Sequence, residues 1–415
     1  MKVLLKSSSG YGAWFGLRLE TEGHSVAYCL DDKRFSPILE GLLAKSEDEP
    51  SDPDLVIFDL TGNGAKAEKY DCPVLGDSLL ADKLEDDRLF GLDSMRNNKI
   101  KVAPYEEFDS IAKARSFIGK TNKRYVFKPC GDDQDTAATY VSSGPADLVE
   151  YLDKLEAMSH GSNFILQEFI SGIEVSTEGW FLNGKWYFVN HTLEEKKFMS
   201  GSIGPNTGCS GNIVWLGSSD SALFKATLDN MTSFLAEHNY YGMVDINTIV
   251  TQHGVYGLEW TPRFGYDATA TQIQFMKNGF GSFLESFFSE ELGDPKEIQK
   301  SGFASSIRVS IPPYPLETNK NVYQEGVPVK GITDLASCYL YDVNAEEGTE
   351  NLVSAGLSGF ICSPTAYAFT FGEAFQKIEA YVKKIKIPNM QYRNDIAQST
   401  FKRYKELRGS GWIAS

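Results

Sequence analysis

Two acidic residues, Asp245 and Glu259, fall in segments that the sequence predicts to be the two strands of one hairpin. Residues 242–250 alternate apolar and polar side chains, as half-buried strands do, and a turn at 252–254 leads into residues 257–265. If the hairpin registers about Gln252 and His253, the two acidic faces can meet. Because side chains on a strand alternate between its faces, each acid shares a face with the residue two positions further on. Those companions also carry side-chain oxygens: Asn247 and Thr261.

Paired carboxylates beside an arginine suit Mg2+ held against nucleotide phosphates. Magnesium takes hard oxygen ligands and usually binds through one or two carboxylates together with phosphate oxygens. Arg263 follows Glu259 in the same segment and would add a positive charge. A polar sheet face with a surface arginine is the alternative interpretation, because paired acids are often merely structural.

A lysine and a third acid offer contacts to a nucleotide. The strand predicted at 123–129 carries Lys128 near its end, before a polar loop at 131–136, and such a lysine can contact a phosphate as a point charge. The apolar strand predicted at 164–170 is followed by Glu174, so this region could offer backbone groups to an adenine edge and a carboxylate to a ribose. A solvated strand-end lysine is the alternative for Lys128.

Glycine-rich segments at two places could approach a ligand with backbone N–H groups, because glycine has no Cβ. Residues 201–211 form the richer segment, which is predicted to be a loop. The other, Gly10-Tyr-Gly12, lies in a strand–helix–strand pattern (2–6, 13–22 and 24–30), in which the helix N-terminus can hold an anion. It departs from the GxGxxG dinucleotide motif by one residue, so an oxidoreductase is only a weak alternative.

Composition excludes several classes of protein. At 415 residues the chain is expected to form about two to four subdomains, and its hydrophobic content of 42% excludes wholesale disorder. A net charge of -16 argues against binding to a nucleic-acid backbone. The apolar runs are shorter than the roughly 20 residues that a membrane helix needs, and no export signal is visible. We therefore expect a cytoplasmic protein without membrane or nucleic-acid partners.

The six cysteines lie far apart, with no CxxC pair and no Cys/His cluster, so neither a zinc site nor a disulfide scaffold is predicted. Reduced and mostly buried thiols are expected. Cys209 is the predicted exception, because it lies in the glycine-rich segment and would be accessible.

Short motifs follow one another in a fixed order along most of the chain. They are Leu84-Glu85 before Arg88 and Phe90, Phe127-Lys128, Gln167-Glu168-Phe-Ile170 with Gly172 and Glu174, Lys196 before Gly204-Pro-Asn-Thr-Gly208 and Gly211, Glu259, Arg263-Phe-Gly265, Gln272, Ser354-Ala-Gly356 and Tyr392-Arg-Asn-Asp-Ile396. Each motif is weak alone, but in combination they are specific. Together they resemble the ATP-grasp superfamily and, within it, glycinamide ribonucleotide synthetase.

The resemblance implies a multidomain chain of α/β and α+β class with an ATP-grasp fold, an N-terminal doubly wound α/β domain and a small C-terminal domain. The expected domains are an N-terminal one at 1–104, a small lid over ATP at 105–175, a catalytic core at 176–302 and a C-terminal domain at 303–415 that completes the active site. Between these regions the sequence shows neither repeats nor a low-complexity linker.

The resemblance also implies roles for single residues. Nucleotide contacts fall on Arg88 and Lys128 for the phosphates, on Gln167, Glu168 and Ile170 for adenine, and on Glu174 for ribose. Glu259 would hold the metal, and Thr261 stands where the family has its second ligand, an Asn. Many ATP-grasp enzymes use a further acid on the preceding strand, and Asp245 occupies that place.

Catalysis and substrate binding are implied for the remaining motifs. The expected catalytic residues are Arg263, Lys196 and Asn206. The expected substrate contacts are Gly204, Pro205, Asn206, Thr207 and Gly208, together with Gly10 and Gly12.

Departures from the family gather where it meets phosphoribosylamine. The family's N-terminal GSGGREH reads Ser7-Ser-Ser-Gly-Tyr-Gly-Ala13, without the charged pair, and its DPETQ reads Tyr266-Asp-Ala-Thr-Ala-Thr-Gln272. The loop at 131–136, which covers ATP in the family, is rich in acids that would repel a triphosphate unless they turn outward or bind metal. We therefore predict that phosphoribosylamine is a poor substrate and that a different amine is used.

The expected function is that of an ATP-dependent carboxylate–amine ligase that works through an acyl phosphate. ATP and Mg2+ (or Mn2+) are the expected cofactors, glycine or another amino acid and an amine are the small-molecule partners, and the chain is a monomer or homodimer. Two alternatives stay open: an ordinary phosphoribosylamine glycine ligase of purine synthesis, and a nucleotide-binding protein without catalysis.

Overall fold

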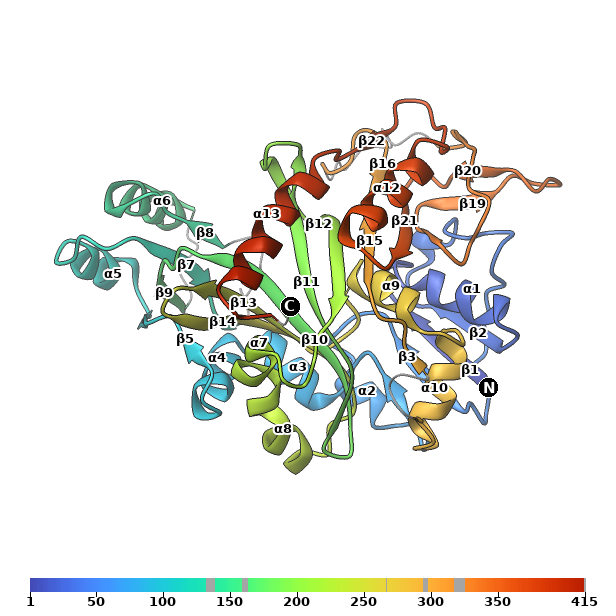
Figure 1. The fold of residues 1–415 in the computed structure, drawn as a ribbon. Coiled ribbons are helices and arrows are strands. Elements are labelled where there is room, and N and C mark those ends of the chain that lie inside the picture. Colours follow the sequence, from blue (N-terminus) through green and yellow to red (C-terminus); the bar gives the residue numbers. More distant parts are fainter. Residues whose placement is uncertain (132–138, 159–162, 266, 294–297, 317–324, 414–415) are drawn as a thin grey trace.

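A mixed sheet runs through the centre of the molecule and continues into its C-terminal part (Figure 1). The computed structural model describes residues 1–131, 139–158, 163–265, 267–293, 298–316 and 325–413. Within them the sheet has eleven strands, in the order β22-β16-β21-β15-β12-β11-β10-β13-β14-β5 with β18 paired to β21. Its middle strands are β10 (Ile173–Leu182), β11 (Lys185–Met199), β12 (Ile203–Leu216), β13 (Gly242–Thr251) and β14 (Gly254–Thr261).

The N-terminal unit is a parallel four-stranded sheet, which confirms the predicted strand–helix–strand start. β3 is fully buried, as parallel strands covered on both faces usually are. Phe15 packs against Phe264 with ring centroids 4.6 Å apart, so this unit shares its core with the central sheet. The elements are β1 (Lys2–Ser7), α1 (Ala13–Thr21), β2 (Ser25–Leu30), η1 (Lys33–Phe35), β3 (Leu55–Phe58), α2 (Gly64–Ala67) and β4 (Val74–Leu75).

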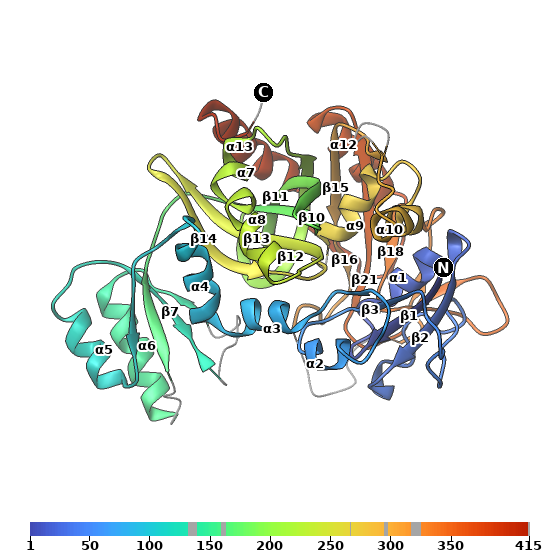
Figure 2. The ribbon, with the colours of Figure 1, turned by 90° about the horizontal axis from the view of Figure 1, so that it is seen from below.

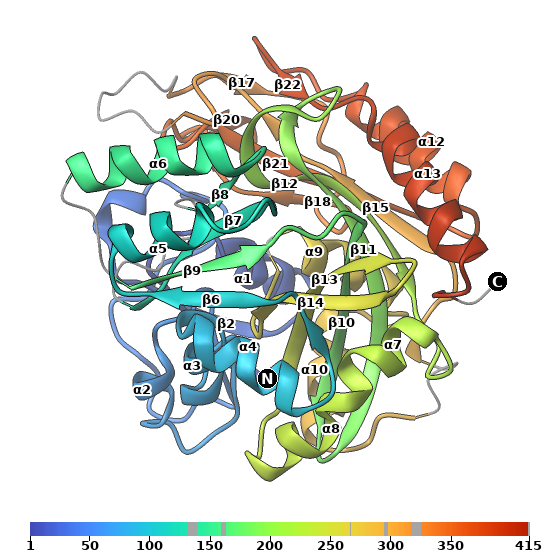
Figure 3. The ribbon, with the colours of Figure 1, turned by 90° about the vertical axis from the view of Figure 1, so that its left-hand side faces the viewer.

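A smaller body with a core of its own lies at the opposite end of the molecule from the N-terminal sheet (Figures 1 and 3). Its sheet has the order β6-β9-β7-β8 and is covered by α5 and α6. These elements form the lid body, named for the lid that is expected at 105–175. They are β6 (Tyr105–Phe108), α5 (Ile111–Ile118), β7 (Tyr125–Pro129), β8 (Tyr140–Val141), α6 (Pro145–Ala157) and β9 (Phe164–Glu168).

Two helices lie between the N-terminal unit and the lid body, where the sequence predicts one helix at 79–95 (Figure 2). α3 (Leu79–Asp86) ends at Asp87, whose backbone is extended. The same residue caps α4 (Arg88–Asn97), because its Oδ1 accepts a hydrogen bond of 3.0 Å from the N–H of Phe90. The prediction missed this cap, and β5 (Lys101–Val102) then joins the central sheet.

Residues 201–211 lie mostly in a strand, and the prediction of a loop was wrong. β12 pairs with β11, and the register shifts on both sides of Lys197. Gly204 (φ +83°) and Gly208 (φ +74°) take the positive φ that such irregular pairing requires. The glycines therefore shape a distorted hairpin.

Other predicted helices are shorter than their sequence patterns. The helix predicted at 221–238 divides into α7 (Ala222–Ala226) and α8 (Leu228–Glu237), because Thr227 between them is non-helical and its Oγ1 donates to the carbonyl of Leu223 at 2.7 Å. The helix predicted at 268–278 appears as α9 (Ala268–Gln272) and η4 (Ile273–Phe275), and the one predicted at 280–292 appears as α10 (Phe280–Phe288). Among the described residues, no helix is long and apolar enough to cross a membrane.

The C-terminal part extends the central sheet through β15, which pairs with β12. The sheet therefore continues across the boundary expected at 302. The strands are β15 (Phe303–Ile307), β16 (Val309–Ser310), β17 (Pro328–Val329), β18 (Cys338–Leu340), β19 (Val343–Ala345), β20 (Leu352–Ser354), β21 (Phe360–Ala368) and β22 (Gln391–Tyr392), and the helices are α12 (Phe371–Val382) and α13 (Ile396–Gly409).

All six cysteines are unpaired, and five of them are buried. Cys209 is among the buried ones, so the prediction that it is accessible was wrong. Burial also raises the pKa of its thiol well above the ordinary value, which makes the reactive thiolate rare.

Candidate active site

The β13–β14 hairpin has the register that the sequence predicts. Asp245 lies opposite Thr261, and Asn247 lies opposite Glu259. Directly opposed residues of an antiparallel pair share a face of the sheet. The hairpin therefore presents two carboxylates, an amide and a hydroxyl on one side.

The neighbouring strands extend this polar face with residues that the sequence analysis did not single out. Glu178 of β10 lies between Asp245 on one side and Asn190 of β11 on the other. Asn190 Nδ2 donates to Glu178 Oε2 at 3.0 Å, and Glu178 is 1% exposed. Glu194 of β11 adds another acid, and burial raises its pKa to about 7. The sequence carries a signal for these two acids, because polar residues occupy alternate positions along both strands.

Asp245 has one carboxylate oxygen that no described residue hydrogen-bonds. It is buried, its Oδ2 accepts from Asn247 Nδ2 at 3.3 Å, and its Oδ1 has no hydrogen-bond donor among the described residues. Burial, together with Glu178 and Glu194, raises the pKa of Asp245 well above its ordinary value. A buried carboxylate oxygen in this position is suited to receive a cation.

Four cations act on Glu259. Burial alone would raise the pKa of this carboxyl, but the positive charges hold it below its ordinary value. Glu259 is therefore ionised at neutral pH. The four cations come from the central sheet, the lid body, α4 and the segment after β14: Lys196, Lys128, Arg88 and Arg263.

Lys128 is the buried member of this group. It is 8% exposed at the end of β7, and burial lowers its pKa to about 8, although Glu259 opposes the shift. Because burial disfavours the charge on this ammonium, it gains more from a phosphate than a solvated lysine would. The structure thus disfavours the alternative of a strand-end lysine in solvent.

Lys196 pairs with Glu174, since its Nζ lies 2.5 Å from Oε1 of that residue. Burial opposes the charge on Lys196, but Glu174, Glu259 and Glu194 outweigh it and raise the pKa of the lysine. The residues expected to bind ribose and to act in catalysis are therefore in direct contact.

Two arginines are fixed by groups outside the central sheet. Glu85 Oε1 accepts from Arg263 at both Nε (3.1 Å) and Nη2 (2.8 Å). Arg88 Nε donates to the carbonyl of Pro129 at 2.9 Å, which ties α4 to the lid body. Both guanidinium groups are thus oriented beside Glu259.

The side-chain oxygen atoms at the hairpin fit a hard divalent cation that is also bound by a nucleotide. Asp245 and Glu259 supply carboxylate oxygens on adjacent strands, and Thr261 is paired with Asp245. Among the described residues, no group of three or more His, Cys, Asp or Glu side chains is arranged to hold a metal by itself. Such a set suits Mg2+, which takes its remaining ligands from phosphate and water.

Two residues of the predicted adenine segment make hydrogen bonds and an ion pair with other parts of the protein. Gln167 Nε2 donates to the carbonyl of Ala103 at 3.3 Å, and the N–H of Glu168 donates to that of Pro104 at 2.8 Å. The Glu168 carboxylate is paired with Lys123. The side chains of Gln167 and Glu168 therefore have protein partners in this structure.

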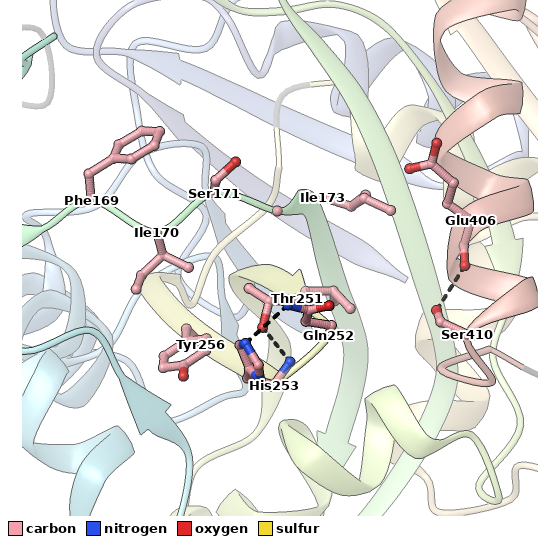
Figure 4. Close-up of a pocket in the computed structure, with 12 residues that line it drawn as sticks. Phe169, Ile170, Ser171, Ile173, Thr251, Gln252, His253, Tyr256, Glu406 and Ser410 are labelled. Atoms are coloured by element: carbon pink, nitrogen blue, oxygen red, sulfur yellow. Dashed lines mark hydrogen bonds between the residues drawn. The ribbon is translucent and has the colours of Figure 1, made fainter. Parts of the chain in front are cut away.

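Ile170 lines a pocket of about 540 Å³ at the hinge between the lid body and the central sheet (Figure 4). The hinge, residues 169–173, forms one side, and the turn of the β13–β14 hairpin, with His253 and Tyr256, forms another. Glu406 of α13 and Ser410, which follows that helix, close a third side. The pocket is partly apolar, as small-molecule sites usually are.

The Gly204-Pro-Asn-Thr-Gly208 motif lies near the tip of the β11–β12 hairpin. Asn206 is exposed and lies opposite Lys197, one residue beyond Lys196. The carbonyl of Thr207 accepts from Arg308 Nη1 at 2.7 Å. Arg308, which the sequence analysis missed, therefore fixes this motif to the C-terminal part.

The turn at Gly10 and Gly12 uses its donors within the protein. The N–H of Gly10 donates to Ser7 Oγ at 2.8 Å, and that of Gly12 donates to Asp59 Oδ2 at 2.9 Å. The predicted phosphate contact at this turn would have to displace these partners.

Comparison with known proteins finds similarity to enzymes that ligate glycine to phosphoribosylamine. Residues 86–269 match the family described as phosphoribosylglycinamide synthetase, ATP-grasp (A) domain. A phosphoribosylamine–glycine ligase of Clostridium acetobutylicum is 24% identical over 340 residues, which are 79% of this chain and 79% of that protein.

Solved structures agree on the fold. A phosphoribosylamine–glycine ligase from Thermotoga maritima has a TM-score of 0.72 at 17% identity and covers 95% of this chain and 100% of its own. A biotin carboxylase complex with β,γ-ATP from Campylobacter jejuni has a TM-score of 0.65 at 12% identity, with 98% of this chain and 96% of its own covered. The chain therefore has an ATP-grasp fold, and its residues 86–269 are similar to the ATP-grasp domain of phosphoribosylglycinamide synthetase.

Proposed function

We propose that the chain is an ATP-dependent ligase that joins a carboxylate to an amine through an acyl phosphate. The observation that supports this most is the charge arrangement around Glu259, a buried and ionised acid under the influence of four cations. Because these cations come from separate elements, they can surround a polyanion such as the phosphate chain of a nucleotide. Glu259 and that polyanion can then bind the same divalent cation.

In the proposed reaction, a carboxylate oxygen of an amino acid attacks the γ-phosphorus of ATP, and ADP leaves. The amine nitrogen then attacks the acyl carbon, phosphate leaves with the electron pair of the broken C–O bond, and the nitrogen loses a proton. An amide, ADP and inorganic phosphate result. Holding both reactants in one site removes much of the entropic cost of their encounter.

The residues have separate tasks in this proposal. Lys128 and Arg263 neutralise charge on the phosphoryl oxygens, and Lys196 orients Glu174 toward ribose. Asp245 and Glu259 would hold Mg2+ or Mn2+, which when bound neutralises the charge of the β- and γ-phosphates.

A second candidate is the ordinary ligation of glycine to phosphoribosylamine, which the similarity over residues 86–269 favours. Complementation of a purine auxotroph that lacks this ligase separates the two candidates. We expect soluble, ATP-binding protein that does not restore growth without purines. Robust growth would favour the second candidate.

The ligase proposal is tested by measuring Mg2+-dependent ADP release with a panel of amino acids and amines, together with mass spectrometry of the products. We expect ADP and amide in equal amounts for at least one pair. Binding of ADP or AMP without turnover by any pair would instead identify a nucleotide-binding protein without catalysis.

A further inference from the structure

One sequence motif, Tyr392-Arg-Asn-Asp-Ile396, has no task in the proposed reaction. It joins β22 to α13, and its arginine is 1% exposed. Arg393 Nε donates to Asp395 Oδ1 at 2.7 Å, Nη1 donates to the carbonyl of Lys197 at 2.9 Å, and Nη2 lies 2.9 Å from Glu195 Oε2. Every nitrogen of the guanidinium group therefore has a partner, and two of these partners belong to β11.

The same motif binds the turn between β11 and β12. Arg393 Nη2 also donates to Ser202 Oγ at 3.1 Å, and Asp395 Oδ2 accepts from the N–H of Gly201 at 2.8 Å. Hydrogen bonds between the two strands fix this region incompletely, because their register shifts on both sides of Lys197. The motif therefore supplies contacts that the strand pairing lacks.

Glu195 is the acid on which these contacts converge. It is 5% exposed, and its carboxylate accepts from Ser399 Oγ and pairs with Arg403 as well as with Arg393. Ser399 and Arg403 belong to α13, which lies beside β11 and β12 (Figure 1). A buried carboxylate with these partners is firmly fixed, because leaving it unpaired in the interior is costly. The side chain of Glu195 is therefore held toward α13.

The next residue along β11 points to the other side of the sheet. Successive side chains of a strand alternate between its faces, and Lys196 Nζ lies 2.5 Å from Glu174 Oε1, where its charge acts on Glu259. The carbonyl of Lys196 accepts from Thr207 Oγ1 at 3.2 Å, so its backbone is bound as well. A displacement of Glu195 would therefore displace Lys196 on the side where we place the nucleotide.

We infer that Arg393 is a positioning residue, which acts through Glu195 to hold Lys196 against Glu174. The C-terminal segment thereby controls nucleotide binding without touching the nucleotide. Only this nucleotide part of the inference rests on the proposed function. Lysine cannot replace the arginine in this role, because its single ammonium reaches fewer acceptors than the guanidinium fork, although the charge stays the same.

The contact between Lys196 and Glu174 can be tested without any ligand, by acetylation with acetic anhydride and mass spectrometry. Burial opposes the charge on Lys196, but Glu174 and other acids outweigh it and raise the pKa, so the reactive neutral amine is rare. Arg393→Lys should loosen the pair. Acetylation of Lys196 relative to Lys185, an exposed residue of the same strand, should then rise about 3-fold, as for a fall of roughly half a pKa unit. An unchanged ratio in the folded variant would overturn the inference.

Two further variants separate positioning from loss of stability. Arg18 also ties its helix to the C-terminal part, because it donates to Glu22 Oε1 at 2.5 Å and to the carbonyl of Ala336 at 2.9 Å. Arg18→Lys is therefore the matched control, and a rise of equal size in it would overturn the inference. If Arg393→Lys does not fold, Asp395→Asn takes its place, since Asp395 is only half-buried. The ratio should then rise in Asp395→Asn, and its constancy would contradict the inference.

Calorimetry with ADP and Mg2+ tests the consequence for the nucleotide. Arg393→Lys should weaken ADP binding about 10-fold, and the same substitution in a Lys196→Met background should change it little, because residues that act through one another are not additive. An equal loss in both backgrounds would show a merely structural role and overturn the inference. A wild-type protein that binds no ADP refutes the proposed function instead, whereas the acetylation of Lys196 still decides the role of Arg393.

Discussion

Glu85 holds Arg263 by two hydrogen bonds to a single carboxylate oxygen, 3.1 Å from Nε and 2.8 Å from Nη2. The two residues stand far apart in sequence, one on α3 and the other just after β14. Their contact fixes the guanidinium that we place beside the transferred phosphoryl group.

Glu85→Gln should therefore disturb catalysis more than binding. Loss of the charged acceptor loosens Arg263, and misplacement of a charge-stabilising group costs about 10-fold to 100-fold in rate. We expect kcat to fall by that factor while the KM for ATP changes little, in steady-state assays of ADP release. Glu106→Gln, at an exposed position on the lid body, is the matched control and should behave as wild type.

Glu259→Gln should abolish turnover while the protein stays folded. The substitution keeps the shape but removes the charge that balances four cations and would hold the metal. We expect a loss of at least about 100-fold in ADP release, by analogy with other charged groups in preorganised sites. Circular dichroism checks the fold, and turnover near the wild-type rate would show that the metal ligand lies elsewhere.

Asp245→Asn should have opposite effects on activity and stability. Burial and neighbouring acids raise the pKa of Asp245, so its favourable contribution to stability exists at low pH and is lost as pH rises through the raised pKa. Asparagine avoids that loss, and we expect a higher Tm than wild type at pH 8 without Mg2+. Activity should fall severely. Wild-type activity would show that the second ligand is misplaced.

Lys128 should set an alkaline limit to ATP use. Its pKa is lowered to about 8 in the free protein, so the charged form prevails below pH 8 and is lost above it. We expect kcat/KM for ATP to fall up to about 10-fold per pH unit above this value. Lys128→Arg, which stays charged, should remove the fall. A flat wild-type profile between pH 7 and 9.5 would contradict the assignment.

The sequence predicted the hairpin register and the central charged group because both follow from local patterns. Alternation places Asp245 and Glu259 on one face, and the resemblance directs Lys128 to the same site. Glu178 and Glu194 were missed because alternating acids on a strand look like a solvated face until the neighbouring strands are known.

Other features depend on contacts that no local pattern encodes. Arg308 reaches Thr207 and Asp267 only because β15 pairs with β12. The hydrogen bond from Gly12 to Asp59 likewise depends on the pairing of β3 with β1, because Asp59 directly follows β3 and so reaches the turn before α1. The break between α3 and α4 could have been predicted from the sequence, because Asp is a favoured N-cap residue that accepts from the N–H three positions later.

The most direct test of the ligase is the fate of a carboxylate oxygen. Amino acids labelled with 18O in the carboxylate are incubated with the protein, MgATP and hydroxylamine, and the released phosphate is analysed by mass spectrometry. Transfer through an acyl phosphate predicts one 18O atom in the phosphate for each hydroxamate formed, with no transfer by Glu259→Gln. Unlabelled phosphate, or ADP release that does not depend on any amino acid, would contradict the proposed function.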